Sequence, residues 1–146
     1  MQALILAAGM GKRLKELTRD SAKCMVEVNG RTLIERMLFQ LDELNLTEII
    51  IVVGYKAKEL ISFINTLNIR TPIIFVTNEI YSKTNNIYSL YIARDYLIKD
   101  DTLLLESDLI LSDGVLKKAN RQHLSEFSIG SQIRKLDGRN CCYNRR

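Results

Sequence analysis

Four short runs of apolar, β-favouring residues recur along most of this sequence, with longer segments between them. In chain order the runs are Leu4–Ala7, Ile49–Val53, Ile73–Val76 and Leu103–Leu105. Each run is shorter than a typical helix and lacks polar alternation, as is typical of strands buried on both faces of a parallel sheet. Because parallel strands need long crossover connections, these runs predict a series of strand–helix–strand units.

Helical periodicity occupies the segments between the runs. Apolar side chains recur at three- and four-residue spacing over residues 33–44 and 60–67, and less regularly over residues 87–97. Asn68 and Pro72 separate the second helical segment from the third strand. This order predicts an α/β fold with a doubly wound, mostly parallel sheet and a ligand crevice at the carboxyl ends of its strands.

Charge is distributed unevenly along the chain. Residues 1–120 contain 15 Lys+Arg and 15 Asp+Glu, whereas residues 121–146 contain 6 and 2. The last 26 residues therefore carry the whole formal charge of +4. Since a neutral body is not typical of a nucleic-acid-binding domain, we expect no nucleic-acid partner.

The cysteine and hydropathy patterns favour a cytoplasmic protein. Cys24 is the only cysteine of the body, and the adjacent Cys141 and Cys142 do not suit a disulfide framework. His123 is the only histidine, so no zinc-ligand spacing occurs. No apolar run approaches the roughly 20 residues of a membrane span, and no basic residue precedes the first apolar stretch as in a signal peptide. We expect no membrane partner.

The loop after the first predicted strand has the composition of a phosphate-binding turn. Gly9 and Gly11 flank one residue, which allows a tight turn whose N–H groups point at an anion. The small side chains of Ala7 and Ala8 leave room for a flat ring or a ribose, and Arg13 can bind phosphate in a bidentate manner. An ordinary strand-to-helix turn with exposed basic side chains is the alternative. The loop matches neither the P-loop pattern nor the dinucleotide-binding fingerprint.

A wider set of motifs is similar to the NTP-transferase (nucleotidylyltransferase) family. The similarity runs from about residue 2 to residue 118 and includes the segments 7–14, 21–25, 28–35 and 53–55. Segments 78–81 and 85–90 look most like the cytidylyltransferases of the phosphocholine type. The resemblance implies a Rossmann-like nucleotidylyltransferase fold. One departure is Ala22, where the family usually has a proline, and this loosens the backbone that leads to Lys23.

The resemblance also implies a reaction. A phosphate oxygen of the acceptor attacks the α-phosphorus of a nucleoside triphosphate, and pyrophosphate is released. Backbone N–H groups near Gly9 and Gly11, together with Arg13, would hold the β- and γ-phosphates. Lys23 would bridge the α-phosphate and the incoming phosphate as negative charge builds up. A solvated surface lysine is the alternative for Lys23.

An acidic segment, residues 106–108, directly follows the last predicted strand. Carboxylates at this edge suit Mg²⁺, which binds one or two of them together with phosphate oxygens. Strand alternation predicts that Glu106 and Asp108 point to the same side. The family match assigns the metal to Asp108, with Glu106 as its neighbour; an aspartate that only caps a turn is the alternative. The family's second metal-binding aspartate belongs to a later half of the domain, and no position here supplies it.

Polar residues at the start of the third helical segment are candidates for contacts with the nucleotide. Asn85, Asn86 and Ser89 could bind the edge of a pyrimidine or the ribose, although asparagine is also a favoured N-cap residue. The tyrosines at 81, 88, 91 and 96 could form an aromatic box for a quaternary ammonium group. Their spacing fits helix packing better.

The sequence divides into two parts with different patterns. We expect residues 1–120 to be the nucleotide-binding part of a nucleotidylyltransferase domain whose sheet is incomplete at its C-terminal side. Residues 121–146 form an atypical basic tail with no strand or helix period. One hypothesis is that the tail is translated out of frame from about residue 123, because one possible coding string gives a strand-and-turn sequence when shifted by one base. A natural divergent tail is the alternative.

Three functions remain open from the sequence. The first is a Mg²⁺-dependent cytidylyltransferase that transfers CMP from CTP to a small phosphorylated acceptor such as phosphocholine. The second is a sugar-1-phosphate nucleotidylyltransferase, which would use UTP or dTTP and a hexose phosphate. The third is a non-catalytic remnant that binds nucleotide weakly, because the later half of the family domain is missing.

Overall fold

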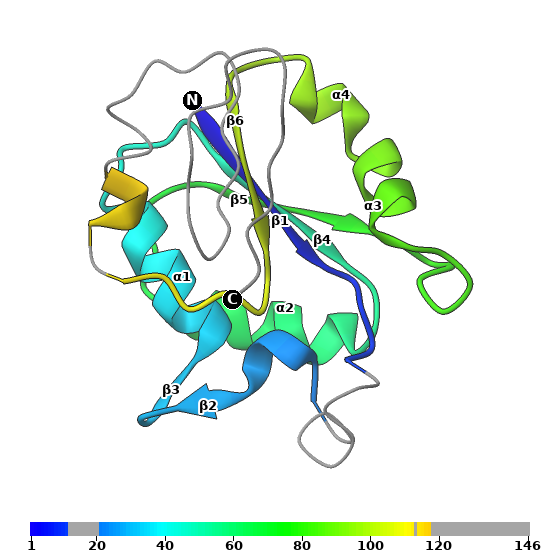
Figure 1. Cartoon of the computed structure of the whole chain (residues 1–146), viewed down its shortest axis with the longest axis horizontal. Helices are drawn as coiled ribbons and strands as arrows, with labels where there is room; N and C mark the ends of the chain where they lie inside the picture. Colours follow the sequence, from blue (N-terminus) through cyan, green and yellow to red (C-terminus); the bar gives the residue numbers. More distant parts are fainter. Residues whose placement is uncertain (12–20, 113, 118–146) are drawn as a thin grey trace, which may run out of the picture.

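A parallel four-stranded sheet forms the centre of the computed structural model, which describes residues 1–11, 21–112 and 114–117 (Figure 1). The strands are β1 (Gln2–Ala7), β4 (Ile49–Val53), β5 (Ile73–Thr77) and β6 (Thr102–Glu106), in the order β5-β4-β1-β6. All four lie where the apolar runs predict them, each within two residues at its ends. The basic tail, residues 121–146, lies outside the described residues, and so does the hypothesis of a frame change there.

The strand order reverses direction at β1. The chain moves from β1 to β4 and then to β5 on one side, and it returns to β6 on the other side of β1. Leu4 of β1 accordingly lies opposite Ile50 of β4 and also opposite Leu104 of β6. In open α/β sheets such a reversal opens a crevice outside the carboxyl ends of the two diverging strands. The predicted doubly wound, mostly parallel fold is confirmed.

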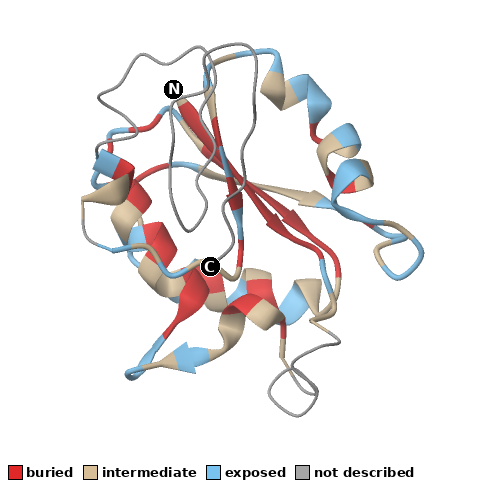
Figure 2. Cartoon of the chain, viewed as in Figure 1, coloured by how far each residue is buried: buried red, intermediate tan, exposed pale blue. Residues whose placement is uncertain are grey.

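Helices cover both faces of this sheet. On one face lie α1 (Leu33–Asp42) and α2 (Ala57–Thr66), whose apolar side chains pack against Ile5 and Ile51. On the other face lie α3 (Asn86–Ile92) and α4 (Arg94–Leu97), which cover Leu4 and Ile50. Figure 2 shows the result, with the central strands buried between the two helical layers. These three layers place the loops after the strands together at one end of the molecule.

Two helices differ from the predicted segments. The segment 33–44 ends as a helix at Asp42, because the N–H of Leu44 bonds to the carbonyl of Leu41 in a tighter turn. The segment 87–97 is two helices that meet at Ala93, whose N–H donates to the carbonyl of Leu90. Ala93 is fully buried against the sheet, so the break lets both short helices follow the twisted sheet surface.

Two small elements between β1 and α1 were not predicted. The first is the single turn η2 (Lys23–Met25), and the second is a hairpin of β2 (Glu27–Val28) and β3 (Arg31–Thr32). At the hairpin turn, Asn29 and Gly30 both have positive φ, 53° and 74°. Asn-Gly is the usual signal for a two-residue hairpin turn of this kind, so the turn could have been predicted from the sequence.

A buried carboxylate fastens the end of α1 to the segment before β5. Asp42 accepts hydrogen bonds from the N–H and hydroxyl of Thr71, at 2.8 and 2.7 Å, and from the N–H and Nε of Arg70, both at 3.1 Å. Burial alone would raise the pKa of the Asp42 carboxyl, but these bonds outweigh it and lower the pKa to about 2. The contact lies at the amino end of the sheet and supports the fold rather than the site.

None of the helices in the described residues is long and apolar enough to cross a membrane. Within the same residues, β6 pairs only with β1 and forms an edge of the sheet.

Candidate active site

Backbone hydrogen bonds at the carboxyl end of the sheet tie together the ends of the four strands and the segments that follow them. The N–H of Tyr55, after β4, donates to the carbonyl of Ala8, after β1, at 3.1 Å. The N–H of Asn78, after β5, donates to the carbonyl of Val53 at 2.8 Å. After β6, the N–H of Ser107 donates to the carbonyl of Leu6 at 3.3 Å. These bonds hold the loops close together around the end of β1.

The predicted phosphate loop begins directly at this point. The side chains of Ala7 and Ala8 are buried, one on each face of the sheet, so only their backbone borders the crevice. Gly11 has a φ of 61°, a left-handed conformation that glycine adopts without strain. A Cβ added at Gly9 would meet no atom of the described residues within 4 Å, which leaves space beside Gly9 in that part of the chain. Arg13, the predicted phosphate-binding arginine, lies outside the described residues.

Gly54 is required by the close approach of the neighbouring loops. A Cβ on this residue would lie 2.7 Å from the Cβ of Tyr81 and 2.9 Å from the carbonyl oxygen of Ala8. Both distances are below van der Waals contact, and backbone is one of the two neighbours. The absence of a side chain at Gly54 therefore lets the loops after β1 and β4 pack directly on each other.

Lys23 and Asp108 form an ion pair at the carboxyl end of the sheet. The Nζ of Lys23, on η2, donates to Oδ2 of Asp108, in the turn after β6. The two side chains are 34% and 33% exposed, so both remain accessible from the crevice. Ala22, which precedes Lys23, has a φ of −64°. This is the value that proline imposes, so the backbone at Ala22 has the conformation that a proline at this position would have.

The next residue, Cys24, points into the core. Its side chain is 1% exposed, and it is a free thiol. Burial is the main reason that the pKa of Cys24 is raised to about 12, and the nearby charge of Asp108 adds to the effect. The buried Cys24 anchors η2 against the sheet, which keeps Lys23 at the surface.

Glu106 and Asp108 do not act as one cluster, contrary to the expectation from strand alternation. Oε1 of Glu106 accepts a hydrogen bond of 2.7 Å from Nδ2 of Asn86, on α3, whereas Asp108 bonds to Lys23, on η2. The physical reason is that β6 ends at Glu106, and residues 107 and 108 form a turn in which side chains no longer alternate. The two carboxylates therefore bond to partners that lie on opposite faces of the sheet.

The donor set at Asp108 fits Mg²⁺ in part. A half-buried carboxylate at the ligand edge is the type of group that Mg²⁺ binds together with phosphate oxygens and water. Among the described residues, no group of three or more His, Cys, Asp or Glu side chains comes together. Asp108 therefore fits as one protein ligand of a metal whose other ligands come from a bound triphosphate, and it does not fit as part of an all-protein cage.

The three polar residues of the third helical segment lie in different environments. Oδ1 of Asn85 accepts hydrogen bonds from the N–H groups of Ile87 and Tyr88, so this residue caps α3. Ser89 is 3% exposed and its hydroxyl bonds to Nδ2 of Asn78 at 3.2 Å. Asn86 is exposed and directed to Glu106 at the sheet edge. Ser89 is therefore buried, whereas Asn85 and Asn86 are exposed, and the side-chain oxygen of Asn85 is used by the cap.

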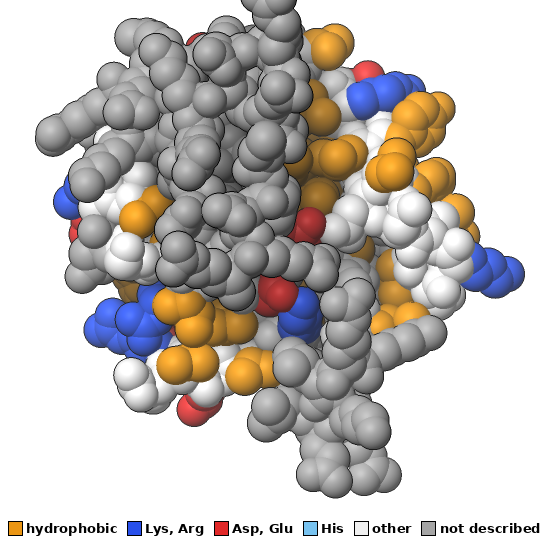
Figure 3. Space-filling view, viewed as in Figure 1, with side chains coloured by type: hydrophobic (Ala, Val, Ile, Leu, Met, Phe, Trp, Pro, Cys, Tyr) orange, Lys and Arg blue, Asp and Glu red, His pale blue; other side chains and the backbone are white. Residues whose placement is uncertain are grey.

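The tyrosines do not gather into one aromatic box. Tyr96, on α4, packs against the sheet, as the helix-packing interpretation predicts, whereas Tyr81 packs there from the turn before α3. Tyr91 is 57% exposed, and the guanidinium of Arg94 lies 4.5 Å from the centre of its ring. Figure 3 shows hydrophobic side chains gathered over α3 and α4, where Ile87 and Ile98 are exposed too.

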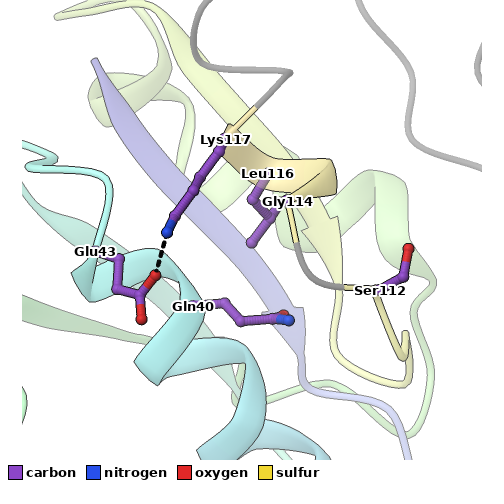
Figure 4. Close-up of a pocket in the computed structure, with 6 residues that line it drawn as sticks. All are labelled: Gln40, Glu43, Ser112, Gly114, Leu116 and Lys117. Carbon is purple, nitrogen blue, oxygen red and sulfur yellow. Dashed lines mark ion pairs between the residues drawn. The ribbon is translucent and has the colours of Figure 1, made fainter.

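A groove elsewhere on the molecule is separate from these residues. It lies between the C-terminal end of α1 and the segment 112–117, and it is lined by Gln40, Glu43, Ser112, Gly114, Leu116 and Lys117 (Figure 4). The Nζ of Lys117 and Oε2 of Glu43 form an ion pair of 2.7 Å in it. Because α1 ends near the amino end of the sheet, this groove is not part of the crevice.

Comparisons with known proteins agree with this geometry. The sequence model of the MobA-like NTP transferase domain matches residues 3–128. CTP:phosphoglutamine cytidylyltransferase of Campylobacter jejuni is 37% identical over 112 residues, which are 77% of this chain and 42% of that protein. UTP–glucose-1-phosphate uridylyltransferase of Haloferax volcanii is 32% identical over 137 residues, 94% of this chain and 55% of that protein.

A solved structure gives the same relationship in three dimensions. CTP:phosphocholine cytidylyltransferase of Streptococcus pneumoniae superposes with a TM-score of 0.63 at 36% identity, and the match covers 73% of this chain and 44% of that one. The chain thus spans about half the length of the relatives it matches. The family model covers most of the chain, from the first strand through the acidic turn after β6. The chain therefore belongs to the MobA-like NTP transferase domain family.

Proposed function

We propose that this chain carries the nucleotide-binding half of a Mg²⁺-dependent cytidylyltransferase. The reaction transfers CMP from CTP to a small phosphorylated acceptor such as phosphocholine and releases pyrophosphate. The observation that carries the proposal is the pairing of Lys23 with Asp108 at the strand-order reversal, beside a glycine loop with open space above it.

The residues of the site would bind or neutralise different phosphate groups of the nucleotide. N–H groups near Gly9 and Gly11, together with Arg13, would hold the β- and γ-phosphates. Lys23 would neutralise charge at the α-phosphate while an oxygen of the acceptor phosphate forms the new P–O bond. The bond from the α-phosphorus to the bridging oxygen breaks, and that oxygen leaves with pyrophosphate. In-line positioning and charge neutralisation are sufficient for this chemistry.

Asp108 would hold Mg²⁺, which supplies positive charge to the triphosphate when bound. In the structure the carboxylate is already paired with Lys23, so a cation is accommodated at this position. Lys23 would then turn from Asp108 to the phosphates.

The nucleoside would lie on the α3 side of the loop. The backbone of Ala7 and Ala8 would border the ring or ribose, and Asn86 is the accessible side chain at that edge. Asn85 and Ser89 would contribute mainly by fixing the start of α3, since their oxygens already bond within the protein. A cytoplasmic location agrees with the buried free thiol of Cys24.

A sugar-1-phosphate nucleotidylyltransferase is the second candidate. It is favoured by one observation, namely that the uridylyltransferase of Haloferax volcanii matches 94% of this chain. The two cytidylyltransferases have the higher identity, 37% and 36%, and this is why we place CTP first. A non-catalytic nucleotide-binding remnant is the third candidate, because the chain spans about half of its relatives.

Pyrophosphate release tests these candidates together. The chain is incubated with Mg²⁺ and each of CTP, UTP, dTTP and ATP, combined with phosphocholine or glucose-1-phosphate. The proposal predicts release with CTP and phosphocholine that stops when Mg²⁺ is chelated. Release with UTP or dTTP and glucose-1-phosphate would favour the second candidate. Nucleotide binding without release from any pair would favour the remnant.

A further inference from the structure

The hydrogen bond between Asn86 and Glu106 fixes which end of the Asn86 amide faces the crevice. A carboxylate can only accept hydrogen bonds, so the amide must turn its NH₂ group toward Glu106. The bond is 2.7 Å long and one partner is charged, which makes it stronger than a bond between neutral groups. The carbonyl oxygen of Asn86 is then directed away from Glu106, and within the described residues it accepts no hydrogen bond.

This pair stands next to the loop that begins the proposed nucleotide site. Glu106 is the register partner of Leu6, two residues before the loop starts at Ala8. Asn86 is exposed at the start of α3, on the layer opposite Lys23 and Asp108. The N–H groups at the start of α3 are already capped by Asn85, so the side chains and not the helix end define this surface.

The negative charge of Glu106 disfavours a phosphate at this surface and favours a neutral group. The Glu106 carboxylate would repel a phosphate, whereas Lys23 lies on the other side of β1. The pair leaves the carbonyl oxygen of Asn86 as an acceptor for a ligand. An acceptor held in this orientation binds a group with an N–H donor, and it is left unsatisfied against a carbonyl group.

We propose that Glu106 is a positioning residue that fixes the Asn86 amide with its oxygen outward, and so selects a nucleobase that carries an exocyclic amino group. Cytosine presents an amino group at the position where uracil presents a carbonyl oxygen, so the pair would favour CTP over UTP. This inference rests on the proposed function, because it requires a nucleoside triphosphate in the crevice. It identifies Glu106 as the residue that would favour CTP, the substrate of the first candidate function, over UTP, a substrate of the second.

The test is the ratio of the CTP and UTP dissociation constants, measured by calorimetry with Mg²⁺ on the 146-residue chain. The chain as it stands should bind CTP about tenfold more tightly than UTP, or more. In Glu106→Gln the side-chain amide can donate as well as accept, so the Asn86 amide is free to turn over. The ratio should then fall about tenfold toward equality. Because both nucleotides have the same triphosphate, an indirect effect on Mg²⁺ would change both constants equally and leave the ratio unchanged.

A double-mutant cycle tests whether Glu106 acts through Asn86. Asn86→Ala should lower the ratio to the same extent as Glu106→Gln, and adding Glu106→Gln to Asn86→Ala should lower it no further. Asp101→Asn is the matched control, since it removes one exposed carboxylate at the opposite end of β6 and should leave the ratio unchanged.

The outcomes separate the inference from the function on which it rests. Equal affinity for CTP and UTP in the unaltered chain, or an unchanged ratio in Glu106→Gln and Asn86→Ala, overturns the inference and leaves nucleotide binding in place. Failure of the unaltered chain to bind any nucleoside triphosphate overturns the proposed function, and the inference falls with it. Should Glu106→Gln fail to fold, Glu106→Ala removes the same acceptor and gives the same ratio test.

Discussion

Lys23 and Asp108 are 85 positions apart in the chain, yet their side chains form an ion pair at the carboxyl end of the sheet. Lys23 follows the loop after β1, and Asp108 follows β6, which is the neighbour of β1 on the side where the strand order reverses. A cation and a carboxylate are thereby placed together at the point where α/β sheets bind ligands. Both side chains are about one third exposed, which suits a functional pair better than a stabilising one.

Replacement of Asp108 should affect ligand binding far more than folding. Because exposed ion pairs contribute roughly 0–1 kcal/mol, Asp108→Asn should change the free energy of unfolding by less than about 1 kcal/mol. The same change should abolish the Mg²⁺-dependent binding of CTP, which titration with and without the metal measures. Unaltered Mg²⁺ dependence in Asp108→Asn would show that the metal is held elsewhere. Asp95→Asn, a change of an exposed aspartate on α4, is the control.

Asp42 should make the stability of the fold depend on acid pH. Its pKa is lowered in the folded chain from 3.8 to about 2, so its contribution is complete above pH 4 and is lost as the pH falls toward 2. A shift of this size corresponds to roughly 2 kcal/mol. Asp42→Asn should lose about this much at pH 7 and show a flatter decline of stability below pH 4.

Urea denaturation between pH 7 and pH 3 measures both effects of the Asp42 change. Asp95→Asn again serves as control, because its side chain is 74% exposed and makes no comparable set of hydrogen bonds. Parallel pH curves for Asp42→Asn and the unaltered chain would contradict the assignment.

Gly54 and Gly9 should respond to alanine in opposite ways. Gly54→Ala places a Cβ 2.7 Å from the Cβ of Tyr81 and 2.9 Å from the backbone oxygen of Ala8, so it should destabilise the fold by about 1–3 kcal/mol. The added Cβ of Gly9→Ala meets no atom of the described residues within 4 Å, and Gly9 has no positive φ, so the change should leave stability nearly unchanged. Its added methyl group would occupy the space proposed for the triphosphate, and CTP binding should weaken.

Thermal unfolding and CTP titration of both alanine variants give the comparison. A stable Gly54→Ala would disprove the close packing of the two loops, and undiminished CTP affinity in Gly9→Ala would place the triphosphate elsewhere.

Two variants of Asn85 should separate capping from nucleotide binding. Asn85→Ala removes the cap of α3 and should cost about 1 kcal/mol of stability. Asn85→Asp keeps an oxygen acceptor for the cap but removes the amide donor, so stability should be kept. If CTP affinity in Asn85→Asp equals that of the unaltered chain, Asn85 acts only as a cap and not as a nucleotide ligand. Asn65→Ala, on the exposed side of α2, controls for loss of an asparagine.

The fold was largely predictable because its strands are buried on both faces. Runs such as Ile49–Val53 are apolar throughout, and this pattern can be recognised without any knowledge of the rest of the chain. The break at Ala93 was not predictable, since it depends on the surface of the sheet against which the residue packs. The β2–β3 hairpin was predictable from Asn29-Gly30, but its strands of two residues are too short to show alternation.

The sequence allowed candidate site residues to be named, but it did not predict how they are arranged. The order of the motifs placed Lys23 and Asp108 in one family pattern, but their direct contact depends on the return of the chain to β6 beside β1. The separate directions of Glu106 and Asp108 could not be read from strand alternation, because the strand ends between them. The contact of Asn86 with Glu106 joins two elements 20 positions apart, and no local pattern signals it.

The most direct test of the account is calorimetric titration of the chain with CTP, in the presence of Mg²⁺ and again after its chelation. We predict saturable binding at a single site that requires Mg²⁺ and is lost in Asp108→Asn. Binding that is equally strong without Mg²⁺, or no binding of CTP at all, would contradict the proposed role of the Lys23–Asp108 pair.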